Sequence, residues 1–231
     1  LSVVVSMCGR FTLHSSVHTI ADRFGLTALS LGSISPRYNI APTDNCQILT
    51  SNDQGIGSEL MEWGFVGTSA NKNNSFRIIN SRADKLMNIP RFLGSLQSRR
   101  CLVVADGFYE WERNASALGP MSYHLQDNSP FASAGIGTQG FSPSGIKVKR
   151  FSIITTDANT LVGQVHHRMP VILSEESETA WLDQSKRSSL SFLSMLIPFP
   201  SGSMQSHRVS RYVNRSGNDE KTAIEPIVNW L

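Results

Sequence analysis

The chain has 231 residues, of which 40% are hydrophobic and 17% are charged, so it is long enough to bury a large core. Its formal net charge of +3 allows nucleic-acid binding without requiring it. The cysteines Cys8, Cys46 and Cys101 are far apart and form no CxxC pair, which argues against a disulfide framework or a zinc site and indicates a reducing compartment. No apolar run approaches transmembrane length. We therefore expect a cytoplasmic protein that needs no membrane, metal or cofactor.

Residues 1–7 have neither the basic flank nor the length of a signal peptide. We predict that they are a short leader or a misassigned start, and that residues 8–231 form a single domain. Residues 17–24 carry apolar side chains at helical spacing after two serines that are candidate N-caps, and Gly25 ends the pattern, which predicts a short helix. Residues 37–43 are predicted to be a structured loop, because two prolines disfavour helix there.

Most of the remaining chain is predicted to be extended, in short apolar or β-branched runs between polar turns. The predicted strands are residues 46–50, 60–65, 76–80, 101–105, 108–111, 121–125, 131–136, 147–156 and 171–173. The predicted helices are residues 83–96 with an interruption at Pro90, 157–162, 175–182 and 188–197. This pattern predicts an α+β fold: one β-rich, barrel-like or sandwich-like domain of mainly antiparallel strands with peripheral helices.

Cys8 follows Met7, and a small residue after an initiator methionine is usually exposed when the methionine is removed. A chain that begins at Cys8 presents a thiol and a free α-amine on adjacent carbons. This pair reacts with aldehydes, because the amine forms an imine and the thiolate then closes a thiazolidine ring. An internal cysteine cannot do so, since its nitrogen is an amide. The alternative is a buried cysteine in an N-terminal strand, which sequence position alone favours.

Several polar residues stand where strands are expected. Glu110 lies between two aromatic residues and is either a strand residue that faces water or a desolvated acid with a raised pKa. His166 and His167 would point to opposite faces of an extended segment, so they are a poor metal-binding pair. Asn80 and Arg82 end a predicted strand, where turn formation explains them equally well. Taken singly, each residue has an adequate structural explanation.

Taken together, these residues belong to segments that occur in a fixed order along the chain. The segments are Met-Cys-Gly-Arg-Phe at 7–11, Arg-Tyr-Asn-Ile-Ala-Pro at 37–42, Glu-Trp-Gly-Phe at 62–65, Ile-Asn-Ser-Arg-Ala-Asp at 79–84, Ala-Asp-Gly-Phe-Tyr-Glu-Trp at 105–111, Val-His-His-Arg-Met-Pro at 165–170, and tail matches at 209–214 and 224–226. In this order they resemble the SOS-response-associated peptidase (SRAP) family, over nearly the whole chain from Met7.

The resemblance implies a β-rich α+β fold with a positively charged groove for single-stranded DNA. It also implies that the N-terminal cysteine captures the ring-opened aldehyde of an abasic site as a thiazolidine, which shields the lesion during the response to DNA damage. The family's catalytic residues correspond to Cys8, Asn80, Glu110 and His166. The implied partner is single-stranded DNA that contains abasic sites, bound by a cytoplasmic monomer (nucleoid-associated if the source is bacterial), with no metal or cofactor.

The resemblance also suggests which residues contact DNA. Arg10 and Arg82 are expected to hold phosphates beside the lesion, in a way that weakens with salt. The other predicted DNA-binding residues are Asn39, Pro42, Trp63, Ser210 and Arg211. The Trp63 ring is expected to stack on a base, with a place in the core as an equal alternative. Residues 67–72 lack the tryptophan that many family members carry in this loop, so a wedge-like DNA contact is not carried over.

Cys8 is internal in the chain as written, so this form is expected to be unable to crosslink until residues 1–7 are gone. An autoproteolytic activity that depends on Asn80 or Glu110 is one hypothesis for their removal, and lyase activity is a further one. Two other functions stay open. The first is a cysteine peptidase with Cys8 as nucleophile and His166 as base. The second is a non-covalent binder of single-stranded or modified DNA.

Overall fold

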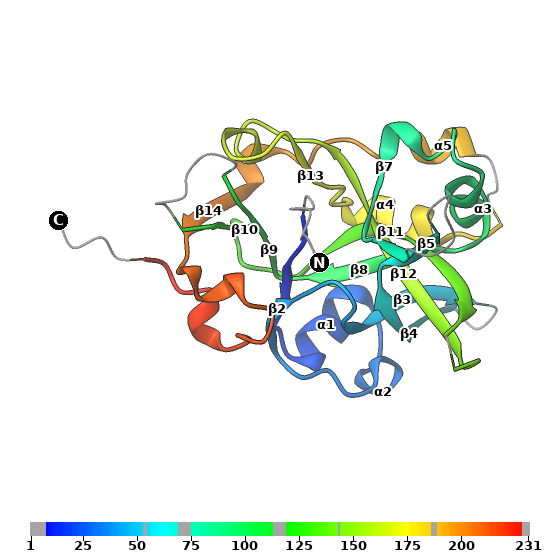
Figure 1. The fold of residues 1–231 in the computed structure, drawn as a ribbon, viewed down its shortest axis with the longest axis horizontal. Coiled ribbons are helices and arrows are strands. Elements are labelled where there is room, and N and C mark those ends of the chain that lie inside the picture. The colour runs from blue at the N-terminus through cyan, green and yellow to red at the C-terminus, as the bar shows by residue number, and fades with distance from the viewer. Residues whose placement is uncertain are drawn as a thin grey trace.

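A computed structural model describes residues 8–52, 55–68, 75–112, 119–142, 144–185 and 189–227 (Figure 1). The predicted leader, residues 1–7, lies outside the described residues, as does most of the loop over residues 67–75. Strands predominate in the described part, and the helices are short and lie at the periphery (Figure 1). The predicted α+β, β-rich class is therefore confirmed.

One sheet joins the N-terminal strand to strands from the middle and the end of the chain. Its order is β14 (Met204–Arg208), β10 (Met121–Leu125), β9 (Gly107–Glu110), β1 (Phe11–Leu13) and β2 (Arg37–Ile40). All neighbours in this sheet are antiparallel, with Phe11 opposite both Ile40 of β2 and Phe108 of β9. Residue 8 therefore enters the sheet beside the end of β9, about a hundred residues away in sequence.

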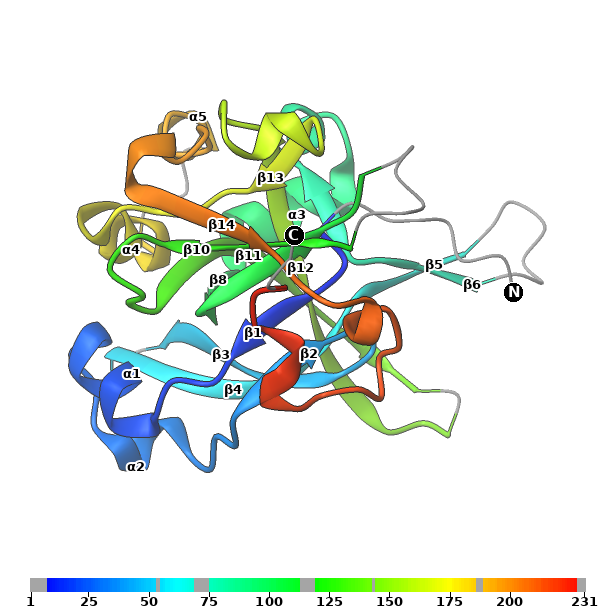
Figure 2. The same cartoon turned by 90° about the vertical axis from the view of Figure 1, so that its left-hand side faces the viewer.

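The second sheet has seven strands and is also mainly antiparallel. It contains β3 (Asn45–Asn52), β4 (Gly55–Trp63), β7 (Asn80–Arg82), β8 (Arg100–Ala105), β11 (Phe131–Phe141), β12 (Lys147–Asp157) and β13 (Arg168–Pro170). Strand β12 is its organising element, because it pairs antiparallel with β11 and β13 and parallel with β4 and β7. Strands β5 (Phe65–Thr68) and β6 (Ser75–Ile78) form a separate hairpin that projects from the body (Figure 2).

The core lies where the two sheets meet. Phe11 of the first sheet packs edge-on against Trp63 of the second, with ring centroids 5.1 Å apart, and Trp63 in turn stacks on Phe151. Strand β8 is buried along its whole length, as its continuous apolar run predicts. Burial of this apolar surface supplies the main driving force for folding.

The helices with clear local signals agree with prediction. Helix α1 (Val17–Phe24) begins after Ser16, whose side chain accepts a hydrogen bond from the Thr19 amide, and ends at Gly25 with φ of 62°. Helix α4 (Glu175–Leu182) has its predicted bounds. The helix predicted over residues 83–96 is only partly correct: a 3-10 turn at Ala83–Lys85 comes first, and helix α3 (Pro90–Ser98) begins at Pro90, where the missing N–H costs nothing. Helix α5 (Ser189–Leu193) ends earlier than the predicted 188–197, and the short helix α2 (Ala28–Leu31) was not predicted. No helix in the described residues is long and apolar enough to cross a membrane.

Three further predictions of secondary structure are wrong. Residues 37–40 are strand β2 rather than a loop, because they pair with β1. Asp157 ends β12 instead of capping a helix, and a short 3-10 helix follows only at Val162–Gln164. The strand expected at residues 171–173 is displaced to β13, with Ile172 making only an isolated bridge to Ser133. In each case partners distant in sequence decide the structure.

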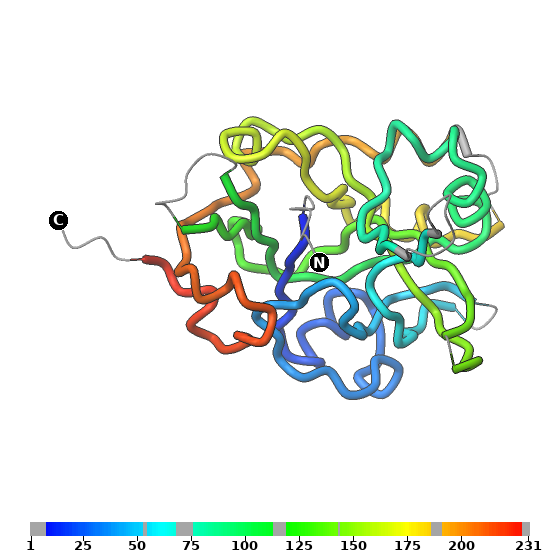
Figure 3. The backbone as a smooth tube through the Cα atoms, viewed as in Figure 1, coloured from blue at the N-terminus to red at the C-terminus, as the bar shows by residue number. Residues whose placement is uncertain are grey.

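The C-terminal segment, residues 209–227, returns to the start of the chain (Figure 3). It contains two 3-10 helices, Arg211–Asn214 and Lys221–Ala223, which pack with Tyr109 in a small second core. The Arg10 guanidinium donates to the Val213 and Asn214 carbonyls at 2.8 and 3.2 Å. The end of the chain thus stabilises the position of its first strand.

Candidate active site

Cys8 and Glu110 meet at the edge of the first sheet. The antiparallel pairing of β1 with β9 carries Cys8, just before β1, to Glu110 at the end of β9. The Cys8 backbone N–H and the Cys8 thiol each donate a hydrogen bond of 2.8 Å to the same atom, Oε1 of Glu110. One carboxylate oxygen therefore contacts both groups of the cysteine that would react with an aldehyde.

The pair is buried, and burial sets its protonation. Cys8 is 2% exposed and Glu110 is 3% exposed. Burial raises the pKa of Glu110 to about 7, while the hydrogen bonds from Cys8 act in the opposite direction. Burial and the neighbouring Glu110 carboxylate raise the pKa of the Cys8 thiol well above its usual value. Near neutral pH Glu110 can therefore both take up and release a proton, as a general acid–base group must.

The backbone of Cys8 adopts a conformation that is rare for a residue with a side chain. Its φ of 46° lies in the left-handed region, which costs on the order of 1 kcal/mol for residues other than glycine. The angle φ is defined by the carbonyl carbon of the preceding residue. This strain therefore exists only while a residue precedes Cys8.

His166 lies two residues before β13 and is buried, whereas its neighbour His167 is exposed, as the alternation argument predicts. The Arg168 backbone N–H donates to His166 Nδ1 at 3.1 Å. The Arg168 carbonyl oxygen lies 3.3 Å from the same nitrogen, so the Arg168 backbone holds the ring through Nδ1 in either tautomer. His166 is thereby fixed in one orientation.

Asn80 and Arg168 lie on strands that flank β12. Asn80 begins β7 opposite Ile153, and Arg168 begins β13 opposite Asp157. Arg168 is buried, and its guanidinium donates to the Asp157 carboxylate at 2.7 Å and to the Thr155 carbonyl at 2.5 Å. Its charge favours the ionised Cys8 thiol, which links this side of the second sheet electrostatically to the Cys8–Glu110 pair.

Sequence reasoning did not single out Arg168, although it lies inside the Val-His-His-Arg-Met-Pro segment. The residue that follows a histidine pair on a strand is expected to face the same side as the first histidine, and this signal was available. The sequence did not indicate that Arg168 is buried or that it pairs with Asp157, because Asp157 was expected to cap a helix.

Four of the predicted DNA-binding residues have exposed or half-exposed side chains. The Arg82 side chain is 45% exposed and pairs with Asp84 at 2.9 Å. Ser210 and Arg211 are exposed at the start of a 3-10 helix, and Pro42 is half-buried. These positions are compatible with contact to a nucleic acid.

Two of the other predicted DNA contacts are fully buried, and the third, Arg10, is engaged in contacts within the protein. Trp63 has no exposed surface, and its Nε1 donates to the Ile79 carbonyl, so the expectation that it stacks on a base is wrong. Asn39 is also fully buried, and its amide donates to three carbonyls of the C-terminal segment, which contradicts a DNA contact. Arg10 is half-buried and donates to Asn39 Oδ1 at 2.8 Å, and burial lowers its pKa.

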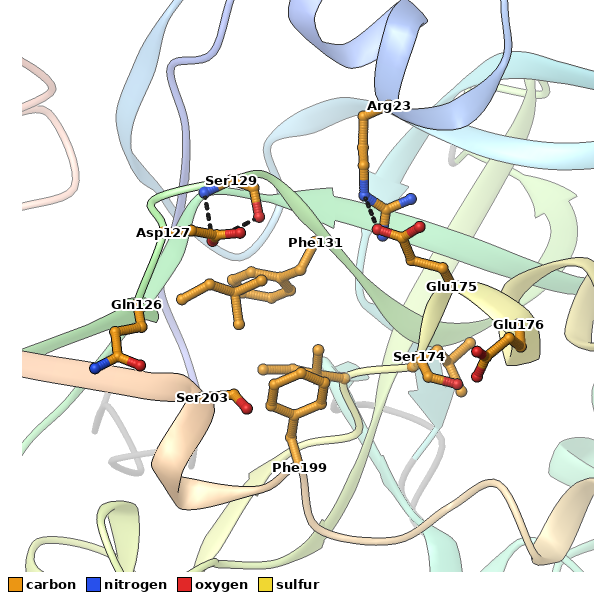
Figure 4. Close-up of a pocket in the computed structure, with 13 residues that line it drawn as sticks. Arg23, Gln126, Asp127, Ser129, Phe131, Ser174, Glu175, Glu176, Phe199 and Ser203 are labelled. Carbon is orange, nitrogen blue, oxygen red and sulfur yellow. Dashed lines mark hydrogen bonds and ion pairs between the residues drawn. The ribbon is translucent and has the colours of Figure 1, made fainter.

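A cavity of about 510 Å³ lies at the other end of β10 from Glu110 (Figure 4). Phe131 and Phe199 point into it, and Arg23, paired with Glu175, lies on its rim (Figure 4). None of the predicted site residues lines this cavity. Within the described residues, no group of three histidine, cysteine, aspartate or glutamate side chains gathers as a metal site.

The sequence and the fold were compared with those of known proteins, and both comparisons found relatives. The family described as SOS response associated peptidase (SRAP) matches residues 7–216. The abasic site processing protein YoqW of Bacillus subtilis (strain 168) is 36% identical over 224 residues, which cover 95% of this chain and 99% of that protein. The abasic site processing protein YedK of Escherichia coli (strain K12) is 27% identical over 231 residues, covering 96% and 100%. A crystal structure of a protein from Bacteroides thetaiotaomicron superposes with a TM-score of 0.81 at 25% identity, covering 96% of this chain and all of that one.

Proposed function

Because this chain belongs to the SOS response associated peptidase family, we propose that it processes abasic sites in DNA by forming a covalent thiazolidine crosslink through Cys8. The names of the YoqW and YedK relatives, which this chain matches along nearly their whole length, support the substrate class. The observation that carries the mechanism is the Cys8–Glu110 contact, in which nitrogen and sulfur share one carboxylate oxygen at 2.8 Å.

The reaction begins with a sugar that is mostly a closed hemiacetal, so the ring must open before an aldehyde exists. In its protonated form the His166 imidazole gives a proton to the ring oxygen and becomes neutral, while the O1 hydroxyl proton passes to the Glu110 carboxylate as the ring C–O bond breaks and the carbonyl forms. The free α-amine of Cys8 then attacks the aldehyde carbon, and loss of water gives an imine. The Cys8 sulfur adds to the imine carbon and its proton passes to nitrogen, which closes the thiazolidine.

Glu110 supports both bond-forming steps. As a carboxylate it accepts a proton from the Cys8 ammonium or thiol, and as an acid it returns that proton to the departing hydroxide. Its pKa of about 7 suits both directions near neutral pH. Asn80 supplies uncharged hydrogen-bonding groups, and Arg82 is an exposed cation for a flanking phosphate.

A second activity, removal of the residues before Cys8, is favoured by the strained φ of 46° and the thiol-to-carboxylate contact. Glu110 would take the thiol proton while Sγ attacks the carbonyl carbon of residue 7. The Cys8 nitrogen then leaves with the proton that Glu110 returns, which gives a thioester and a free amine. Water hydrolyses the thioester, and Cys8 becomes the first residue. Cleavage relieves the backbone strain because φ then lacks its preceding carbonyl.

Crosslinking is tested with protein whose intact mass shows that it begins at Cys8. Incubation with a single-stranded oligonucleotide that carries one abasic site should give a heat-stable shifted band on a denaturing gel. The Cys8→Ser variant should give none. Absence of the band with wild-type protein of confirmed mass would refute the proposal.

The same preparation separates the alternatives. A cysteine peptidase that acts on other chains would cleave a peptide in trans and would not need a free α-amine. A non-covalent binder would retain salt-sensitive DNA binding in Cys8→Ser and form no heat-stable band.

Self-processing is tested by expressing the full chain, since Glu110→Ala should retain residues 1–7 that the wild type loses. Equal processing of the two proteins would exclude Glu110 from that step.

A further inference from the structure

Tyr123 lies on the same face of the first sheet as the Cys8–Glu110 pair. In the antiparallel register of β10 with β9, Tyr123 is opposite Phe108 and Met121 is opposite Glu110. Opposed residues share a face, and so do residues two apart on a strand. Tyr123 is therefore the diagonal neighbour of Glu110. Its ring stacks on that of Phe108, with centroids 5.1 Å apart, which fixes the side chain against β9.

The hydroxyl of Tyr123 is buried and has no hydrogen-bond partner in the part of the chain that the structure describes. The residue is 1% exposed, and its oxygen makes no hydrogen bond to any described residue. Burial, and next the nearby Glu110 carboxylate, raise the pKa of Tyr123, so the hydroxyl keeps its proton and is a donor. The Cys8 thiol lies close enough to contribute to the same shift. A buried donor without an acceptor is unfavourable, and most native structures avoid one.

Tyr109, on the neighbouring strand, shows the ordinary arrangement. It points to the opposite face, and its hydroxyl donates to the Tyr38 carbonyl at 2.7 Å and the Ala223 carbonyl at 3.3 Å. The two tyrosines are both buried, yet only one has its hydroxyl satisfied within the described residues. The difference singles out the face that carries Cys8.

We propose that Tyr123 is a further binding residue, whose hydroxyl donates a hydrogen bond to an oxygen of the abasic sugar when the sugar enters beside Glu110. This inference rests on the proposed function. The apolar neighbours Phe108 and Met121 offer no acceptor, and Glu110 Oε1 already accepts two bonds from Cys8. A deoxyribose brings ring, carbonyl and hydroxyl oxygens, all of which accept. The hydroxyl transfers no proton and only orients the sugar.

The test compares Tyr123→Phe with Tyr109→Phe, which remove one hydroxyl each and retain the ring. In Tyr123→Phe, the single-turnover rate of abasic-site capture should fall about tenfold, equivalent to about 1.4 kcal/mol. Its Tm should be unchanged or higher, because an unsatisfied donor is removed. In Tyr109→Phe, capture should stay within about twofold of wild type, and the Tm should fall by about 2–4 °C.

A second probe separates this inference from the proposed function. An oligonucleotide with a tetrahydrofuran residue in place of the abasic sugar cannot form an imine but retains the ring oxygen. Its reversible binding should be weaker for Tyr123→Phe than for wild type. If wild-type protein fails to crosslink yet this difference is present, the proposed function fails and Tyr123 stands as a sugar-binding residue. Equal binding and equal capture by the two proteins, or a lower Tm in Tyr123→Phe, would overturn the inference.

Discussion

Replacing Glu110 with glutamine should stabilise the protein in a pH-dependent way. The pKa of Glu110 is about 7 in the folded protein against 4.5 for an ordinary glutamate, a difference of 2.5 units. At 1.36 kcal/mol per unit, folding is disfavoured by about 3 kcal/mol when the carboxyl is ionised. Between these two pH values the folded state binds the proton and the unfolded state does not, so wild-type stability falls as pH rises. Glutamine retains an acceptor for Cys8 and carries no charge to desolvate.

The assay is urea unfolding of wild type and Glu110→Gln between pH 4 and pH 9. The variant's advantage in unfolding free energy should be near zero at the acid end, grow between pH 4.5 and pH 7, and level off at up to about 3 kcal/mol. Glu225→Gln, at an exposed carboxylate, should show no such trend. A difference that does not change with pH, or a wild type that gains on the variant as pH rises, would refute a desolvated Glu110.

The remaining predictions concern one catalytic, one DNA-binding and one structural residue. His166→Ala should slow capture about 100-fold in single-turnover gels, because the proton donor is lost, whereas His167→Ala at the exposed neighbour should not. Arg82→Gln should weaken binding of single-stranded DNA and reduce the slope of log K against log salt by about 1 without lowering the Tm, since Arg82 is exposed and its ion pair is with the nearby Asp84. Arg100→Met should cost about 3 kcal/mol in urea unfolding, because this buried guanidinium donates to three backbone carbonyls, whereas an equal stability would show that those carbonyls find other donors.

Local signals in the sequence predicted helices α1 and α4 well. A serine before the apolar periodicity and a glycine after it fixed both ends of α1, and an acidic first turn marked α4. The Cys8–Glu110 contact also agrees with the expectation that these two residues belong to one site. That expectation came from ordered segments along the chain, which report on a shared site even where single residues do not.

The sequence did not distinguish residues available to a ligand from residues whose side chains are buried and hydrogen-bonded within the fold. Asn39 and Trp63 belong to the same ordered set of segments that carries the site residues, yet both are fully buried and hydrogen-bonded to distant backbone carbonyls. Burial depends on which strands pair across the sheets, and one-dimensional patterns do not contain that information. Strand β2 was missed for the same reason, since its pairing with β1 outweighs the flanking prolines.

The return of the C-terminal segment to β1 has a consequence for the order of events during synthesis. Glu110 is 102 residues from Cys8, and the Val213 carbonyl that holds Arg10 is 203 residues from it. Contacts between such distant residues form late in folding. On the ribosome, the first strand thus emerges long before its neighbours, and the cysteine can meet its general base only after about half of the chain has been translated. The contacts that hold Arg10 in place wait for the C-terminal segment, so the reactive site is complete only when the polypeptide is nearly finished.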